Sequence, residues 1–247
     1  MITVASLWRH PIKSHGREAL DSVTLDAGKT MPWDRHWAVT HQKSKFDTSN
    51  PEWVMCRNFM IGNLTPDLAG IWASFDDATQ MMTLRHADLG EITFNPDTPA
   101  DFLKWVAPLS ADQSISPTGL VTADVGMTDS PFASISLMNT ASHLSVAQQM
   151  NHDLEPERWR GNIWLDGLPA WEERDLLGKT IRIGTAQLDI KEHIVRCGHT
   201  KANPHTGKRD LDTLAALQAG WGHQEFGVYA IVSKSGRLTV GDKAQVL

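Results

Sequence analysis

Short apolar runs separated by turn residues recur along most of this chain, and this spacing limits the folds that it can adopt. The runs are rich in β-branched and aromatic residues, which favour strands, whereas the Gly, Asp and Ser between them favour turns. Antiparallel strands joined by short turns favour a barrel or a sandwich over a doubly wound parallel sheet. The runs with strand character cover residues 2–8, 36–40, 71–75, 81–86, 90–94, 132–139, 162–167, 180–184, 186–195 and 227–233.

Three further segments have the apolar spacing of helices, and residues that cap helices stand at their ends. Thr98 can cap the first helix, with Pro99 at its first position. Asn139 or Ser142 can cap the second helix, and Gly220 can end the third. The expected helices cover residues 98–109, 143–150 and 211–220. We therefore expect a mainly β fold with peripheral helices.

Turn residues also predict which runs pair as hairpins. Residues 71–75 and 81–86 form one expected hairpin, and residues 180–184 pair with 186–195 in a second. The run that begins at residue 227, a Ser-Gly turn and the segment that follows it predict a closing hairpin.

A stretch rich in turn residues and poor in periodicity begins near residue 110, so we place a domain boundary there. It divides the chain into an N-terminal β-rich α+β subdomain, residues 1–111, and a C-terminal domain, residues 112–247.

Charge and missing motifs exclude several classes of function. The 247 residues carry a formal net charge of −6, whereas a duplex-binding protein would show a basic surplus, so no nucleic acid is expected as a partner. The motifs GxGxxG and GxxxxGK[ST] are absent, which argues against the nucleotide enzymes that depend on them. No run approaches the ~18 consecutive apolar residues of a membrane span, so no membrane is expected as a partner.

Two features of the sequence predict the compartment. The apolar run at the N-terminus is too short for a signal peptide, and its charges follow the run. The two cysteines, Cys56 and Cys197, lie far apart, which is unlike the framework of a secreted disulfide protein. We therefore expect two reduced thiols and a cytoplasmic location in a prokaryote-like cell. Cys56 has no motif around it, and we predict that it is structural.

Cys197 lies in "HIVRCGHTKANPHTGKRD", residues 193–210, among many cationic or titratable side chains. Neighbouring positive charge lowers the pKa of a thiol and stabilises the thiolate, which is the nucleophile and the metal ligand. The local pattern leaves four interpretations open. Cys197 could be a buried packing residue. It could ligate zinc together with His193, His199 and His205.

The other two interpretations make the thiolate reactive. Cys197 could be a nucleophile with a histidine base, although no cysteine-protease signature surrounds it. It could also ligate a soft transition metal whose remaining ligands come from a cofactor, with the basic residues bound to the anionic part of that cofactor. The residues alone do not choose among the four.

Motifs elsewhere in the chain resemble those of one known family. "LWRHPIKS" (7–14) is similar to its Tyr-Pro-(Val/Ile)-Lys-Ser opening, and "DRHW" (34–37) is similar to its Asp-Arg-x-Trp. "SISLMNTAS" (134–142) is similar to a Ser-rich segment that precedes a helix. "RWRGNIWLDG" (158–167) is similar to an Arg-x-Arg-Pro-Asn-(Ile/Leu) stretch.

The C-terminal part completes the resemblance. "RCGHTKANPHTG" is similar to Arg-Cys followed by a Pro-x-Thr-Gly turn, "LDTL" follows it, and "FGVYAIVSKSGRLTVGD" is similar to the closing segment of the family. In this order the motifs resemble the MOSC domain of molybdenum cofactor sulfurases, preceded by the N-terminal MOSC β-barrel subdomain. The pairing resembles the mitochondrial amidoxime-reducing components and their bacterial relatives.

The resemblance implies a molybdenum cofactor, a Mo-pyranopterin, and names the residues that would hold it. Cys197 would be the protein ligand of molybdenum. Arg196 directly precedes Cys197 in the sequence. The resemblance also implies an association with pyridoxal phosphate. The pyranopterin ends in a phosphate, which needs cationic and hydrogen-bonding partners. The residues that match cofactor-binding positions are Lys13, Ser14, Arg35, Ser136, Arg160, Asn162 and Arg196.

Two departures from the family pattern affect these expectations. Gly161 stands where the family often has Pro, and Gly loosens the backbone, so we expect Asn162 to be held less firmly than Arg160. His10 replaces the usual Tyr, which alters whatever that ring contacts. We also expect Asp34 to hold Arg35 in place, and Arg196 to bind either the cofactor or an acid such as Glu192.

The relatives imply a function. They reduce N-hydroxylated compounds, namely amidoximes, hydroxylamines and hydroxylated nucleobases. The sequence ends five residues after Asp242 without the cysteine set of a fused ferredoxin, so a separate donor is expected: a ferredoxin- or cytochrome b5-like protein with a reductase. The alternative is a carrier that binds the cofactor, or sulfur as a persulfide on Cys197, without turnover.

Overall fold

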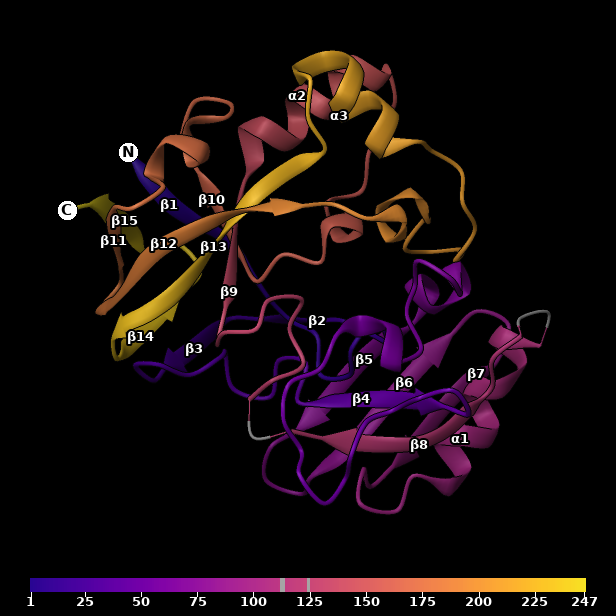
Figure 1. Cartoon of the computed structure of the whole chain (residues 1–247). Coiled ribbons are helices and arrows are strands. Elements are labelled where there is room, and N and C mark those ends of the chain that lie inside the picture. The colour runs from indigo at the N-terminus through magenta and orange to yellow at the C-terminus, as the bar shows by residue number, and fades with distance from the viewer. Residues whose placement is uncertain (112–113, 124) are drawn as a thin grey trace.

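Seven strands form a closed barrel, which is the larger part of the protein (Figure 1). This computed structural model describes residues 1–111, 114–123 and 125–247. Around the barrel the strands follow the order β10–β9–β13–β12–β11–β15–β1, and β1 closes it by pairing with β10. They are β1 (Ile2–Arg9), β9 (Ile135–Asn139), β10 (Ile163–Asp166), β11 (Thr180–Ile183), β12 (Ala186–Val195), β13 (Glu225–Lys234) and β15 (Lys243–Val246).

The alternation of apolar and polar residues explains how the barrel is filled. On β11, Ile181 and Ile183 are buried while Arg182 between them is exposed. On β12, Leu188 and Ile190 are buried in the same way. Because successive side chains of a strand point to opposite faces, this alternation places one face inside. The buried cluster takes residues from all seven barrel strands.

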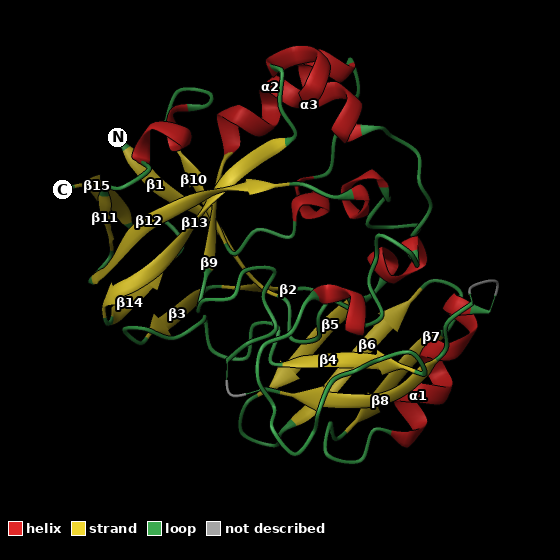
Figure 2. Cartoon of the chain, in the orientation of Figure 1, coloured by secondary structure: helices red, strands yellow, loops and turns green. Residues whose placement is uncertain are grey.

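A smaller β-rich part lies beside the barrel (Figures 1 and 2). Here β4 pairs with β8, and β5, β6 and β7 form an antiparallel sheet. Phe102 and Val106 of helix α1 join its buried cluster. The elements are β4 (Trp37–His41), β5 (Trp72–Asp76), β6 (Met81–His86), β7 (Gly90–Phe94), α1 (Ala100–Val106) and β8 (Pro117–Thr122).

Helices α2 (Thr140–Met150) and α3 (Thr213–Trp221) pack against each other outside the barrel. Asn139 caps α2, since its side chain accepts a hydrogen bond from the Ala141 amide at 3.0 Å. The remaining strands are short: β2 (Glu18–Leu20) pairs antiparallel with β1, and β3 (Ser22–Leu25) pairs with β14 (Gly236–Thr239). No helix within the described ranges has the length and apolar character to span a bilayer.

The loop between β1 and β2 connects the two parts. The Arg17 guanidinium is buried and donates to the carbonyls of Ala69 (2.7 Å), Ile71 (3.1 Å) and Pro204. It also lies over the ring of Trp72, 3.9 Å from its centroid. Arg17 therefore links the β5 region with the loop that follows Cys197. The residues between His10 and Arg17 are consequently held between the barrel and the smaller part.

The mainly β fold with peripheral helices is confirmed, and the hairpins β5–β6 and β11–β12 form as predicted. The capping asparagine of α2 is also confirmed. The predicted boundary between residues 111 and 112 falls where Asp112 and Gln113 lie outside the described residues.

Several local predictions are wrong. Thr98 does not cap α1; Pro99 stands at the N-cap, and the Thr98 hydroxyl donates to Asn95 O at 3.4 Å. Helix α3 passes through Gly220 and ends at Trp221, and the C-cap is Gly222, whose φ of 76° is left-handed.

The closing hairpin is also wrong. Strand β13 already has β12 and β9 on its two edges, so β14 pairs with β3 and β15 pairs with β1 and β11. The sequence pattern also missed β8, which lies in the stretch that we interpreted as turn-rich.

Candidate functional site

A cavity of about 280 Å³ opens between the barrel and the smaller part, near the lower end of the ~300–1,000 Å³ that small-molecule sites occupy. Its walls come from the loop after β1, the segment 53–63, the strands β9 and β13, and the loops that contain Arg160 and Cys197. Seven of the eight residues expected from the sequence line this cavity: Lys13, Ser14, Arg35, Ser136, Arg160, Arg196 and Cys197.

Three of these residues have left-handed backbone conformations. The φ angles are 62° at Ser14, 48° at Arg35 and 49° at Arg160. Such angles are uncommon for residues other than glycine and persist only where the surrounding structure enforces them. At Arg35 the enforcement is visible, since its amide donates to His10 O at 2.7 Å and its carbonyl accepts from the Met127 amide at 2.8 Å. The chain is therefore bent where it presents side chains to the cavity.

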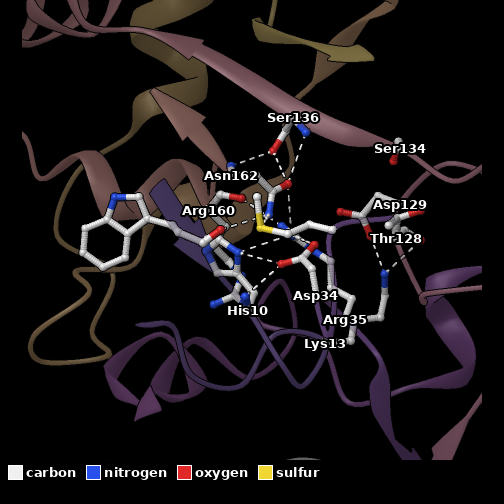
Figure 3. Close-up of polar contacts among 12 residues, drawn as sticks. His10, Lys13, Asp34, Arg35, Thr128, Asp129, Ser134, Ser136, Arg160 and Asn162 are labelled. Atoms are coloured by element: carbon white, nitrogen blue, oxygen red, sulfur yellow. Dashed lines mark hydrogen bonds and ion pairs between the residues drawn. The ribbon is translucent and has the colours of Figure 1, made fainter. Parts of the chain in front are cut away.

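The eighth residue, Asn162, lies behind the cavity wall and is 2% exposed. Its Oδ1 accepts from the Ser136 amide (3.1 Å) and the Ser136 hydroxyl (2.8 Å), and its own amide donates to that hydroxyl at 2.9 Å (Figure 3). Its Nδ2 donates to Trp8 O at 3.2 Å. Asn162 therefore joins β9, β1 and β10. In this arrangement the Ser136 hydroxyl donates its hydrogen to Asn162. Towards a ligand it can therefore act only as a hydrogen-bond acceptor.

The expectation that Gly161 loosens this region is wrong. A Cβ on Gly161 would lie 2.2 Å from Cγ of Met138, so glycine is what allows the chain to approach β9 closely. The close approach brings Asn162 into reach of Ser136 and secures it.

Arg35 is anchored by Asp34, as expected, and by further contacts to the Arg160 carbonyl and the His10 ring. Its Nη1 donates to the carboxylate of Asp34, and its Nη2 donates to Arg160 O at 2.8 Å (Figure 3). Burial would raise the pKa of Asp34, but Arg35 and His10 together hold it below its usual range. The His10 ring lies 3.2 Å from Arg35 Nη1, and burial lowers its pKa, so the ring is neutral. Asp34 holds Arg35 as predicted.

Lys13 extends to another wall of the cavity. Its ammonium donates to Met127 O at 2.8 Å and forms an ion pair with Asp129 (Figure 3). Burial opposes ionisation of Asp129, but Lys13 and Arg35 hold the pKa of this carboxyl at about 2. Among the described residues that line the cavity, Asp129 is the one carboxylate. Five lining residues are cationic: Lys13, Arg35, Arg158, Arg160 and Arg196.

Arg160 has the least compensated charge of this set. Its Nη1 donates to Gly16 O at 3.1 Å, whereas its buried Nη2 has no hydrogen-bond partner among the described residues. Burial, together with Arg35 and Arg17, lowers the pKa of Arg160 to about 9. A buried donor without an acceptor costs free energy. An anion in the cavity would supply both the acceptor and the opposite charge.

Cys197 is exposed to the cavity, which contradicts the interpretation of a buried packing residue. The expected lowering of its pKa by charged neighbours is also wrong. Although the residue is open to the cavity, the surrounding walls desolvate the thiol and raise its pKa, which outweighs the opposing effects of the His199 backbone amide and the Arg196 charge. The thiol is therefore protonated at neutral pH until a metal displaces the proton, because a coordinating thiol is deprotonated outright.

The Arg196 guanidinium is hydrogen-bonded to main-chain carbonyls of the protein. It donates to Phe226 O (2.8 Å) and Trp159 O (2.9 Å), and it pairs with no acid in the described structure, Glu192 included. Arg196 thus fixes the chain between the end of β12 and Cys197 against β13 and the segment before Arg160.

The segment 53–63 is the part of the site that our sequence analysis missed. Cys56 is exposed and lines the same cavity as Cys197, so it is not the structural residue that we predicted. Trp53, Met55 and Asn63 line the cavity beside it. No motif marks this segment, and an exposed thiol has no sequence signal of its own. Tyr229 of β13 also lines the cavity, and it is the Tyr of the closing motif.

Two glycines allow segment 53–63 to approach the loop that contains Cys197. A Cβ on Gly62 would lie 1.7 Å from Nδ1 of His199, and a Cβ on Gly198 would lie 2.3 Å from Oδ1 of Asn63. His199 is buried and lines the cavity, whereas His205 is exposed near Trp72 and does not.

We predict that Gly62→Ala separates these two segments. The added methyl group would displace the buried His199 ring, which should lower the free energy of unfolding by about 1–3 kcal/mol, as overpacking does. Gly220→Ala is the control, because Gly220 lies in α3 with room for a Cβ and should be neutral or stabilising. Urea denaturation measures both variants, and equal stability of the two would contradict the predicted contact.

Neutral buried histidines predict a loss of stability in mild acid. Burial lowers the pKa of His15 to about 4 and that of His199 to about 3. In the unfolded chain both titrate near ~6.5, so below that pH the unfolded state binds more protons than the folded state. We expect the free energy of unfolding to fall by up to about 1.4 kcal/mol per histidine and pH unit from about pH 6.5 to 4. Urea denaturation at several pH values measures this, and His199→Gln should give a shallower curve; parallel curves would contradict the assignment.

An all-protein metal site is not formed. No three His, Cys, Asp or Glu side chains gather to hold a metal within residues 1–111, 114–123 and 125–247. His193, one of the expected zinc ligands, instead contacts Arg174 O (3.2 Å) and Glu225 (3.5 Å). A metal at Cys197 would therefore take its other ligands from a bound group.

Comparison with known families and structures gives three findings. A family model described as the MOSC N-terminal beta barrel domain matches residues 1–107, and the MOSC domain model matches residues 124–245. The YuaD protein from Bacillus subtilis has a TM-score of 0.51 at 16% identity, over 100% of this chain and 96% of that chain, which shows a shared fold. YiiM from Geobacillus stearothermophilus is 20% identical over 46% of this chain and 53% of that chain, with a TM-score of 0.36. No curated protein matches the chain.

Proposed function

The chain belongs to the MOSC domain family, and we propose that it binds a molybdenum cofactor in the cavity and uses it to reduce N-hydroxylated compounds. The observation that carries the proposal is a cavity whose described lining places an accessible thiol, Cys197, among several cationic side chains and the carboxylate of Asp129. A family relationship supports a function connected with the molybdenum cofactor, and the reductase activity is our proposal.

The residues present fit this cofactor. Cys197 offers a soft sulfur ligand, and molybdenum bound by one thiolate needs no further protein ligand if the pterin dithiolene supplies sulfur. The unpartnered Nη2 of Arg160 fits an anion such as a phosphate. Lys13 and Arg35 would share that anion's charge.

When bound, the cofactor supplies the two-electron chemistry that cleaves the N–O bond, so that R–NHOH, two electrons and two protons give R–NH₂ and water. The chain's own residues bind, orient and manage protons. Burial raises the pKa of Tyr229, so its hydroxyl keeps its proton at neutral pH. Tyr229 lines the cavity, so its protonated hydroxyl is a candidate hydrogen-bond donor that orients a bound substrate. His199 is neutral and cannot serve as a cationic acid.

The experiment that tests the proposal is turnover by the cofactor-loaded protein. Reduced methyl viologen provides electrons without a protein partner, and benzamidoxime and a hydroxylamine are the substrates. Formation of benzamidine with matching viologen oxidation is the expected result. A fully loaded protein that produces no amidine or amine would contradict the reductase function. In that case transfer of the cofactor to an apo-acceptor enzyme would support the carrier.

A further inference from the structure

A second hollow lies on the other side of the segment that walls the cavity. Its volume is about 480 Å³, and its lining includes Lys43, Lys45, Arg57 and Leu64. Arg57 directly follows Cys56, and Leu64 directly follows Asn63, both of which line the first cavity. The two hollows therefore share segment 53–64 as a common wall, and this wall is 12 residues of mostly irregular chain with the short 3₁₀ turn Cys56–Asn58.

Cationic side chains gather around this second hollow. Lys43, Lys45 and Arg57 are exposed, and none forms an ion pair with any residue that the structure describes. Arg209 is also exposed and donates to Asn63 O at 2.7 Å, which adds a fourth cation on the same segment. Asp47 and Glu52 lie in the adjoining loop and are the carboxylates that the described part of the chain places there. The patch is positive on a chain with a net charge of −6.

Three large apolar side chains that line one or the other of the two hollows are exposed. Met55 is 54% exposed, Leu64 is 51% exposed, and Val195, two residues before Cys197, is 71% exposed. Met55 and Val195 line the first cavity, and Leu64 lines the second. Large apolar side chains that are exposed together and surrounded by charge mark interaction sites. An apolar centre with a charged rim is the usual anatomy of a protein interface.

We propose that this surface, formed by Lys43, Lys45, Arg57, Arg209 and the apolar residues Met55, Leu64 and Val195, docks an acidic electron-donor protein. The proposal rests on the proposed function, because it assigns the route by which electrons reach the site. Carboxylates of the donor would enter the basic hollow, and the apolar residues would contact the donor around its redox group. The small apolar centre suits a transient redox encounter, which buries less surface than a stable complex. A donor seated here would contact segment 53–64, which also lines the Cys197 cavity.

The test compares a protein donor with a small one. The probe is an acidic plant-type [2Fe–2S] ferredoxin, kept reduced by NADPH and its reductase, and methyl viologen radical is the small donor. The variant Lys43→Glu/Lys45→Glu/Arg57→Glu reverses three charges that do not line the Cys197 cavity. The control Lys179→Glu/Lys234→Glu/Lys243→Glu makes the same charge change on exposed lysines outside both hollows.

We expect the patch variant to raise the KM for ferredoxin about tenfold or more at low ionic strength, and to lose the salt dependence of that KM. Its viologen-driven rate should stay within about twofold of wild type, and the control should keep a wild-type KM. Titration of ferredoxin binding gives the same comparison without turnover. If viologen-driven activity is absent but binding depends on the patch, the proposed function fails and the docking surface stands.

Three results would overturn the docking surface. One is an unchanged ferredoxin KM and affinity in the patch variant while viologen activity is normal. Another is failure of wild type to bind ferredoxin at low salt. The third is patch-dependent binding to phosphatidylserine vesicles with no effect on ferredoxin, which would assign the surface to a lipid headgroup layer.

Discussion

Cys197→Ala should lose molybdenum. Wild-type protein produced with cofactor supply should approach one molybdenum per chain, and the variant should contain about tenfold less or lower, since a lost ligand bond worth more than 1.4 kcal/mol weakens binding at least tenfold. The physical reason is that the described residues contain no cluster of three His, Cys, Asp or Glu side chains that could hold the metal without this thiol. Metal analysis and released pterin fluorescence measure the loss, and viologen-driven reduction should fall to background.

Cys56→Ala is the matched control for this experiment. Both thiols are exposed and line one cavity, so non-specific metal capture by surface thiols would fall in either variant. If Cys197 alone is the ligand, Cys56→Ala keeps its molybdenum. Equal molybdenum in wild type and Cys197→Ala would refute the ligand assignment. One equivalent of zinc without pterin would instead revive the zinc interpretation.

The barrel was predictable because its strands carry local information. The alternation of apolar and polar residues, such as Ile181 and Ile183 on either side of Arg182, predicts a strand with one buried face. Strand pairing is not local in the same way. β14 pairs with β3, more than 200 residues earlier in the sequence, because β12 and β9 already occupy both edges of β13. The sequence of the closing segment alone does not show that both edges of β13 are already paired.

The site was predictable only where a motif marked it. Lys13, Arg35 and Arg160 come from separate segments, and local patterns alone do not bring them together. The charges nearest to Cys197 in sequence mislead, because Arg196 serves two carbonyls and Lys201 pairs with Asp212 at 2.8 Å. Burial, which depends on the whole fold, then raises the thiol pKa that neighbouring charge was expected to lower. Cys56 was missed for the same reason, since its exposure to the cavity follows from tertiary contacts.

Arg158, which is buried, and Arg160, which is half-buried, should respond differently to the same substitution. Arg158 donates to Asp210 through two bonds of 2.7 and 2.8 Å and to Glu155 at 2.7 Å, and these hydrogen bonds outweigh burial and raise its pKa. Arg158→Met leaves two carboxylates without their partner. Because both carboxylates are partly exposed, we expect a loss of about 2–3 kcal/mol in the free energy of unfolding, below the range for fully buried pairs.

Arg160→Met should behave differently, because its charge opposes the fold until a ligand binds. Burial, Arg35 and Arg17 all disfavour the charged form of Arg160, and its Nη2 has no acceptor among the described residues. We expect the ligand-free variant to be as stable as wild type within about 0.5 kcal/mol, or more stable. Its affinity for pyrophosphate, a probe for the anionic end of the cofactor, should fall about tenfold or more, since a charged hydrogen bond contributes about 1.5–3 kcal/mol.

Urea denaturation and calorimetric titration of both variants separate the two roles. A residue that only stabilises the fold would lose stability on substitution and leave pyrophosphate binding unchanged, as we expect for Arg158. A residue kept for a ligand would do the reverse, because natural proteins retain unfavourable groups where function needs them. If Arg160→Met loses as much stability as Arg158→Met and still binds pyrophosphate, Arg160 is structural. The anion-binding wall of the cavity would then rest on Lys13 and Arg35, both of which already have a carboxylate partner in Asp129 or Asp34.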